Sequence, residues 1–238
     1  MAIVNVLGSS IAREADYTIY IKAGFEIAVA TTKAYLAQLA IFSLISLYLG
    51  VTNKVISKNE YEEITNEINN MPLYIKETIK DETYLPVAKK IFSKKEIFFI
   101  GRGIDYALCL EASLKLKEIS YINSFAIAAG ELKHGTIALI EPGTLVLCLD
   151  TQDYLYEKML SNIQEIKARG AHVLSIAKEG HREIEAQSNE VIYIPDCRDE
   201  ITPLLSVVPL QLFSYYVAKE RGCNIDKPKN LAKSVTVE

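Results

Sequence analysis

Residues 97–139 read IFFIGRGIDYALCLEASLKLKEISYINSFAIAAGELKHGTIAL, and this stretch contains the pattern that decides the fold. Residues 97–100 form an apolar, β-type run, and the glycine turn 101–103 leads from it into a helical pattern. A buried parallel strand followed by a glycine turn and a helix N-terminus is a common binding place for phosphate and other anions. We therefore expect a parallel α/β unit with an anion-binding turn after residue 100.

The helical pattern after the turn carries two stripes of side chains. At about 100° per residue, one face is apolar and should be the core side, with Leu108, Ala112, Leu116 and Ile119. Glu111, Lys115 and Glu118 form an adjacent stripe, while Lys117 points away to solvent. When two carboxylates and an amine lie at the edge of a buried face, desolvation and their mutual charges can shift the pKa of a group that transfers protons. A second polar cluster, ELKHG at 131–135, follows at loop distance.

Composition places the chain among ordinary globular proteins. It has 238 residues, of which 50% are hydrophobic and 24% charged, and a net charge of −4. A negative net charge does not indicate nucleic-acid binding, and the sequence has no stripe of basic residues that would indicate binding to a membrane surface. The four cysteines are scattered without a Cys-x-x-Cys pair, so we expect neither a metal site nor disulfides, as in a reducing cytoplasm: Cys109, Cys148, Cys197 and Cys223.

One apolar segment, AYLAQLAIFSLISLYLGV at 34–51, is about as long as the shortest membrane spans. Gln38, Ser43 and Ser46 interrupt it. Because its apolar residues lie all round the helix, we expect a helix buried on nearly all sides, with part of its surface available to a subunit interface.

Strand and helix patterns alternate along the rest of the chain, which predicts a doubly wound parallel sheet flanked by helices. We expect strands at 2–6, 17–21, 97–100, 145–149, 172–176 and 191–194, and helices at 31–51, 154–169 and 204–221. Amphipathic helices should fill the linker at 57–95, with an interruption near Pro72. Two strands and one helix before residue 56 cannot close a sheet, so we interpret residues 1–56 as the back half of one domain and 57–238 as a second.

The words KLKEIS (115–120), AAGELKHGTIALI (128–140) and NLAKSVTVE (230–238) together resemble the second sugar-isomerase (SIS) domain of the glutamine–fructose-6-phosphate aminotransferase family. The resemblance extends from NVLGSSIAREAD (5–16) through EIAVATTKAYLAQL (26–39), which is similar to the end of that family's first SIS domain. It implies a chain whose upstream serine- and threonine-rich phosphate loop and glutaminase domain lie outside this sequence.

The resemblance assigns catalytic roles to three side chains. Glu118 corresponds to the base that moves a proton between the first and second sugar carbons, and a carboxylate with a raised pKa suits that task. His134 would open the sugar ring, reaching the site from the neighbouring subunit. Lys233 would form a Schiff base with the open-chain ketose, which predicts that the tail after Pro228 is buried rather than disordered.

The same resemblance places substrate contacts at Lys115, and at Val29 and Ala232 through their backbone groups. We expect Lys115 and Glu118 at the carboxyl edge of the sheet, where ligands bind in such folds. His172 and His181 receive no role. Residues 123–125 and Thr31 depart from the family pattern beside the site.

The implied protein is the isomerase portion of an enzyme that makes glucosamine-6-phosphate from fructose-6-phosphate and glutamine. It would be a cytoplasmic homodimer that binds a sugar phosphate without a metal or organic cofactor, and this segment alone would be inactive. Two alternatives remain at this point: a non-catalytic sugar-phosphate-binding regulatory module, and a related sugar-phosphate deglycase.

Overall fold

The computed structural model describes residues 1–233, and its main body is a five-stranded, all-parallel sheet in the order β4-β3-β5-β6-β7. The strands are β3 (Glu96–Gly101), β4 (Asn123–Ala128), β5 (Leu145–Asp150), β6 (His172–Lys178) and β7 (Glu190–Ile194). The chain moves from β3 outward to β4 and returns across β3 to add β5 on its other side. The topological switch point therefore lies between β3 and β5.

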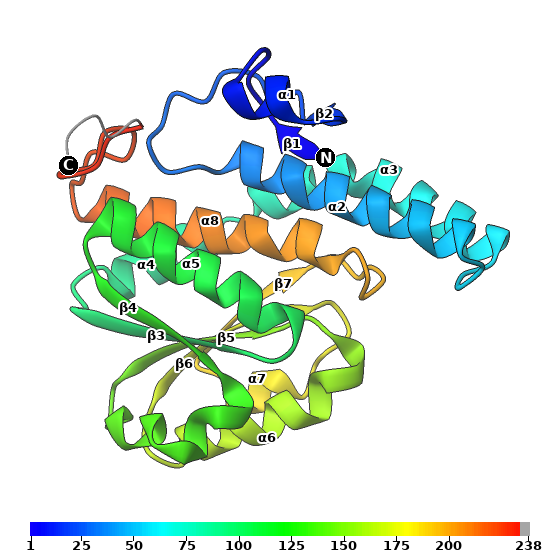
Figure 1. The fold of residues 1–238 in the computed structure, drawn as a ribbon. Helices are drawn as coiled ribbons and strands as arrows, with labels where there is room; N and C mark the ends of the chain where they lie inside the picture. The colour runs from blue at the N-terminus through cyan, green and yellow to red at the C-terminus, as the bar shows by residue number, and fades with distance from the viewer. Residues whose placement is uncertain (234–238) are drawn as a thin grey trace.

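Helices cover both faces of this sheet, which confirms the predicted doubly wound architecture (Figure 1). One face carries α4 (Tyr84–Ile91), α5 (Ile104–Ser120) and α8 (Thr202–Glu220). The other carries α6 (Tyr156–Lys167) and α7 (Ile184–Gln187). Three short 3-10 helices complete the connections: η1 (Ala129–His134), η2 (Thr136–Leu139) and η3 (Asp153–Leu155).

The apolar run of β3 is continuous because both of its faces are covered. Ile97 and Phe99 belong to the core under α5 and α8, and the Phe99 ring meets the edge of Phe213 at 6.2 Å between centroids. Phe98 and Ile100 point the other way, into the core under α6. A strand buried on both faces loses the polar alternation of an exposed strand.

Two long helices form a further layer over α8: α2 (Lys33–Thr52) and α3 (Lys58–Lys80) (Figure 1). The predicted interruption at Pro72 is wrong, because α3 continues through it. A capping box between Ser57 and Glu60 fixes the start of α3, and buried Met71 and Thr78 hold the helix on both sides of the proline. These contacts outweigh the hydrogen bond that the proline removes.

The expectation that the apolar helix α2 is buried on nearly all sides is also wrong for this chain. Leu47 is its one buried residue, and Phe42, Leu44, Tyr48 and Leu49 are exposed. Within residues 1–233, α2 is the one helix long and apolar enough to cross a membrane by length and composition. A single helix of this kind is weak evidence for a membrane span.

The first residues form a separate small unit. β1 (Ala2–Val4) and β2 (Thr18–Tyr20) pair in parallel, apart from the main sheet, and α1 (Ser10–Glu14) connects them. Ser9 caps α1, because its hydroxyl accepts a hydrogen bond from the amide of Ala12.

Candidate functional site

The predicted stripe on α5 lies where the helix ends, at the amino end of the sheet. β4 begins at Asn123, shortly after α5 ends at Ser120, so Lys115 and Glu118 lie near the starts of the strands. The expectation of a site at the carboxyl edge is therefore wrong. The stripe is on the outer side of the helix layer, where α5 meets the loop before α2.

Lys115 is the centre of the stripe. Its Nζ lies 2.5 Å from Glu118 Oε2 and 3.6 Å from Glu111 Oε1, and its side chain is only 6% exposed. Lys117 is exposed on the far side of the helix, with its Nζ 5.7 Å from the centre of the Phe125 ring, as the pattern predicts. The sequence therefore places the three charges on one side of α5 and the fourth on the other.

Glu111 is the most enclosed carboxylate of the stripe, with a side chain 13% exposed against 22% for Glu118. Burial raises the pKa of Glu111, with a further upward contribution from Glu118 that Lys115 opposes. Glu111 in turn raises the pKa of Tyr35 on α2, beyond the effect of burial. The stripe therefore faces α2 at one end and the tail region at the other.

The tail lysine, Lys233, lies in a cradle of oxygen atoms formed by the loop before α2. Its Nζ is 3.0 Å from Ala28 O, 3.3 Å from Glu26 Oε2 and 3.4 Å from both Val29 O and Thr31 Oγ1. The side chain is 46% exposed. Leu231 is 44% exposed, so the prediction that it is buried is wrong; Val235 and Val237 lie outside the described residues.

The same loop also forms a small apolar cavity against α5 and α8. The cavity has a volume of about 70 Å³ and is lined by Ala28, Ala30, Thr32, Lys115, Ile119, Gln211, Ser214, Tyr215 and Ile225. Figure 1 shows the C-terminal tail, this loop and the end of α5 gathered at one corner of the molecule. Segments far apart in sequence thus bring the Lys115 pair and the Lys233 cradle to two sides of one loop.

The two predicted backbone contacts have different surroundings. The amide of Val29 donates to Asp226 O at 3.0 Å, and its carbonyl faces Lys233, so its backbone groups already have partners within the chain. Ala232 is exposed beside Lys233.

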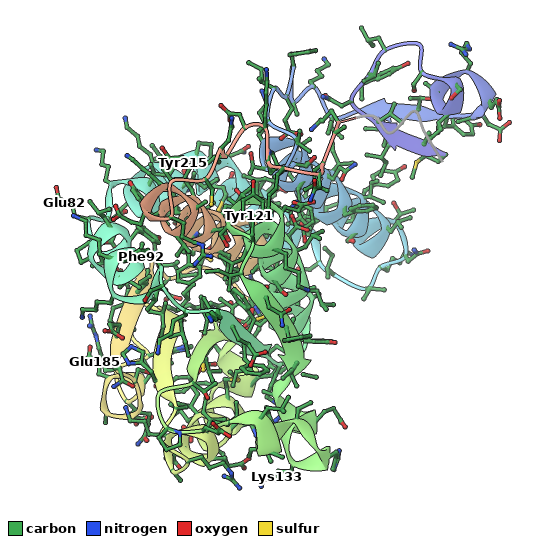
Figure 2. All side chains as sticks on the ribbon, turned by 90° about the vertical axis from the view of Figure 1, so that its left-hand side faces the viewer. Glu82, Phe92, Tyr121, Lys133, Glu185 and Tyr215 are labelled. Atoms are coloured by element: carbon green, nitrogen blue, oxygen red, sulfur yellow. The ribbon has the colours of Figure 1, made fainter. Side chains whose placement is uncertain are left out.

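His134 is not brought to this corner by its own chain. Its side chain is 71% exposed, and Nδ1 lies 2.7 Å from Glu131 Oε2. In Figure 2, its neighbour Lys133 lies at the opposite end of the molecule from Tyr215, which lines the small cavity. A role for His134 at the Lys115–Lys233 corner therefore requires a second copy of the chain.

Side chains of the loop after β5 approach the glycine turn after β3. A Cβ at Gly103 would come within 3.0 Å of Leu155 Cδ1 and 3.2 Å of Tyr154 Oη, and Tyr154 also lines a hollow of about 630 Å³ beside the start of α5. Asp105, buried in the first turn of α5, accepts hydrogen bonds at 2.7 Å from the amide and hydroxyl of Thr151. A buried carboxylate in the first turn of α5 disfavours a second negative charge there, and the anion site at this turn stays a prediction.

A group of paired charges around buried Lys178 lies at the same carboxyl edge. Lys178 is 1% exposed, and its Nζ lies 2.6 Å from Asp199 Oδ1 and 3.0 Å from Asp153 Oδ1. His181 Nε2 lies 3.0 Å from that same Asp153 oxygen. Burial, with nearby acidic groups, raises the pKa of Asp150 to about 8. Within residues 1–233, no group of three or more His, Cys, Asp or Glu side chains is arranged to hold a metal ion.

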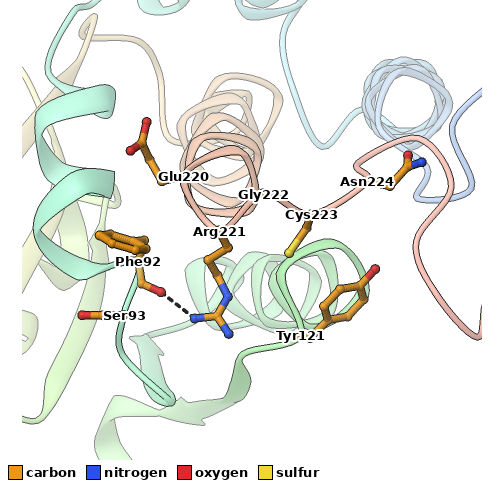
Figure 3. Close-up of a pocket in the computed structure, with 8 residues that line it drawn as sticks. All are labelled: Phe92, Ser93, Tyr121, Glu220, Arg221, Gly222, Cys223 and Asn224. Atoms are coloured by element: carbon orange, nitrogen blue, oxygen red, sulfur yellow. Dashed lines mark hydrogen bonds between the residues drawn. The ribbon is translucent and has the colours of Figure 1, made fainter.

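A larger hollow of about 570 Å³ lies beyond the end of α8, away from the stripe (Figure 3). Its most prominent polar group is Arg221, whose Nε donates to Ser120 O at 2.9 Å and whose Nη1 donates to Phe92 O at 2.5 Å. The guanidinium joins the ends of α4, α5 and α8, so its role there is structural.

Two residues of the corner received no role from the sequence. Glu26 is 9% exposed and contacts Lys233, although the sequence shows it only as an isolated acid in a loop. Glu111 stood in the predicted stripe without a separate role, and only its burial distinguishes it from Glu118. The helical period could identify Glu111, whereas no local signal could identify Glu26.

Comparison with curated proteins gives full-length matches of this chain to one group of enzymes. It is 53% identical over its whole length to the glutamine–fructose-6-phosphate aminotransferases (isomerizing) of Caldanaerobacter subterraneus subsp. tengcongensis and of Clostridium tetani. The alignments cover 39% of each relative, so the chain spans about two fifths of their length.

Solved structures agree with this. The C-terminal domain of glucosamine-fructose-6-phosphate aminotransferase from Francisella tularensis superposes with a TM-score of 0.88 at 33% identity, covering 94% of this chain and 64% of that one. A glucosamine-6-phosphate deaminase from Thermotoga maritima gives 0.70 at 26% identity, covering 98% and 65%. The family model described as the SIS domain matches residues 1–47 and 90–221, and the chain therefore belongs to the SIS domain family.

Proposed function

We propose that this chain is the isomerase portion of an enzyme that makes glucosamine-6-phosphate from fructose-6-phosphate and glutamine. The names of the relatives support this activity. The observation that carries it is the corner where Lys233 and the Lys115–Glu118 pair lie on two sides of the loop at residues 26–32. An amine for carbonyl chemistry and a carboxylate for proton transfer are the two groups that such an isomerisation requires.

The chemistry assigns one step to each group. The neutral amine of Lys233 attacks the carbonyl carbon, C2, of the open-chain ketose, and loss of water gives an imine. Ammonia derived from glutamine then replaces Lys233 at C2. Glu118 takes a proton from C1 and returns one to C2, so that the ketose imine becomes the amino aldose. Lys115, 2.5 Å from that carboxylate, keeps it in place and contacts the sugar oxygens.

The exposed position of His134 supports a homodimer in which this residue opens the sugar ring in the partner's site. We further propose that residues 1–56 complete one SIS domain with an upstream segment that carries the phosphate loop, and that 57–238 form the second. A glutaminase domain in the longer chain would supply ammonia. The enzyme would work in the cytoplasm.

Glu118→Gln in the longer enzyme tests the proposal, because the amide has the shape of the carboxylate and cannot accept the proton. We expect glucosamine-6-phosphate synthesis to fall by about 10²–10⁴-fold, the usual contribution of a general base. Lys117→Gln is the matched control on the exposed side of the same helix and should keep normal synthesis. Near-normal synthesis by Glu118→Gln, in a variant with an unchanged melting curve, would remove Glu118 from the mechanism.

A further inference from the structure

Glu26 makes two sets of contacts at once, one through each carboxylate oxygen. Oε1 accepts hydrogen bonds from the amides of Thr32 at 2.9 Å and Ala34 at 3.5 Å, at the N-terminus of α2. Oε2 lies 3.3 Å from Lys233 Nζ. This one side chain, 9% exposed, joins the start of α2 to a lysine 207 residues further along the chain.

The electrostatics of these contacts favour the ionised carboxylate. Burial alone would raise the pKa of Glu26, but the Thr32 amide, Lys233 and the Ala34 amide together lower it. A helix N-terminus stabilises a carboxylate for the same reason. The N-terminus of α2 and Lys233 therefore stabilise the negative charge of Glu26 together.

Every partner of Lys233 Nζ in the structure is an oxygen acceptor: two backbone carbonyls, one hydroxyl and the Glu26 carboxylate. Such surroundings suit an ammonium group, which has three donors and no acceptor. Imine formation needs the neutral amine, so this arrangement cannot be the reacting one. It holds the lysine at the loop that also lines the Lys115 cavity.

We infer that Glu26 is a positioning residue, which holds the Lys233 side chain on the loop at residues 26–31 before the imine forms and so keeps it at the loop that also lines the Lys115 cavity. The effect of Glu26 on catalysis rests on the proposed function. The contact by which Glu26 holds Lys233 rests on the observed distances alone. Glu26 also makes the position of the tail depend on the start of α2, so that a disturbance of the helix end reaches the lysine.

The variants separate the two contacts of Glu26. Glu26→Gln keeps an amide oxygen that can accept from Thr32 and removes the charge facing Lys233. Glu26→Ala removes both contacts. Glu60→Gln is the matched control: Glu60 also caps a helix, accepting from the Ser57 amide at 2.8 Å, but no lysine contacts it among the described residues.

The first measurement needs no sugar and no catalysis. The 238-residue chain is acylated briefly with acetic anhydride, and the modification of Lys233 is quantified by mass spectrometry against exposed Lys227. An ion pair of this exposure changes an equilibrium by about two- to fivefold. We expect Glu26→Gln and Glu26→Ala to raise the labelling of Lys233 by that factor, and Glu60→Gln to leave it unchanged. Equal labelling in wild type and Glu26→Gln would overturn the inference.

The second measurement follows synthesis by the longer enzyme, with kcat and KM separated. Because Glu26 acts on the lysine rather than on the sugar phosphate, Glu26→Gln should lower kcat about two- to fivefold and leave the KM for fructose-6-phosphate unchanged. A rise in KM with unchanged kcat would contradict a positioning role. A wild-type enzyme that makes no glucosamine-6-phosphate would refute the proposed function, and the labelling result would still decide whether Glu26 holds Lys233.

Discussion

Two clusters of charge lie at opposite ends of the same sheet, and they differ in how completely they are closed. At the carboxyl edge, Lys178 is 1% exposed and Asp150 is equally buried. At the amino end, Lys115 is 6% exposed and Lys233 is 46% exposed. The first cluster is sealed by residues of β5, β6 and the loop before α8. The second is assembled from α5, the loop before α2 and the tail.

The difference distinguishes the usual ligand crevice of this fold from the corner that carries the predicted catalytic residues. In open parallel sheets, ligands bind beyond the carboxyl ends at the switch point. In this chain Tyr154 and Leu155 lie close to Gly103 of the switch-point turn, and Asp105 accepts a hydrogen bond from the Thr151 amide. The sealed cluster stabilises the fold, whereas the open corner has the exposed amine and the paired carboxylate that chemistry needs.

The largest expected effect on stability comes from removing the sealed amine. Lys178→Met removes the counter-charge of Asp199, whose side chain is 22% exposed, and breaking a pair with one fully buried partner costs about 3 kcal/mol of unfolding free energy. Lys233→Met, at the open corner, should change stability by less than about 0.5 kcal/mol, since exposed pairs contribute little. Urea denaturation of both variants measures the contrast, and similar losses in the two would show that the clusters are equally structural.

A smaller effect, with a pH signature, is expected at Asp150. Burial, then Asp105, Asp153 and Glu157, raises its pKa from 3.8 to about 8. Because the folded pKa is the higher one, the stability contribution is present at low pH and is lost as pH rises between about 4 and about 8. Asp150 Oδ2 also has no hydrogen-bond partner in the part of the chain that the structure describes. Asp150→Asn should therefore stabilise the chain at pH 8 by about 1–3 kcal/mol, the cost of an unsatisfied buried group.

The measurement is the unfolding free energy of wild type and Asp150→Asn at pH 5 and pH 8. The wild type should lose stability between these values more steeply than the variant. A constant difference at the two pH values would mean that Asp150 is already ionised at pH 5 and that its burial is compensated elsewhere.

The sheet could be predicted from the sequence because most of its strands are continuous apolar runs. Apolar runs separated by amphipathic helices gave β3, β5, β6 and β7 close to their observed bounds. β4 was missed, since its sequence NSFAIA begins with polar residues and its burial is uneven along the strand. The exposure of α2 could not be predicted either. An apolar helix has the same sequence pattern whether residues of its own chain cover it or not.

For the site, the helical period placed Lys115, Glu118 and Lys117 on the correct sides of α5, because 3.6 residues per turn fixes those directions. It could not place α5 against the sheet, so the predicted carboxyl edge was wrong. The approach of Lys233 to Glu26 is a contact across 207 residues, which no local pattern encodes. The catalytic roles of Glu118, His134 and Lys233 remain predictions.

The central claim is that chemistry occurs at the open corner and not at the sealed switch point. The most direct test is reduction of the longer enzyme with borohydride in the presence of fructose-6-phosphate and without glutamine, followed by mapping of the sugar adduct. Our account predicts the adduct on Lys233 and none on Lys178, whose side chain is 1% exposed. An adduct on Lys178, or a wild-type enzyme that makes glucosamine-6-phosphate but shows no adduct on Lys233, would contradict it.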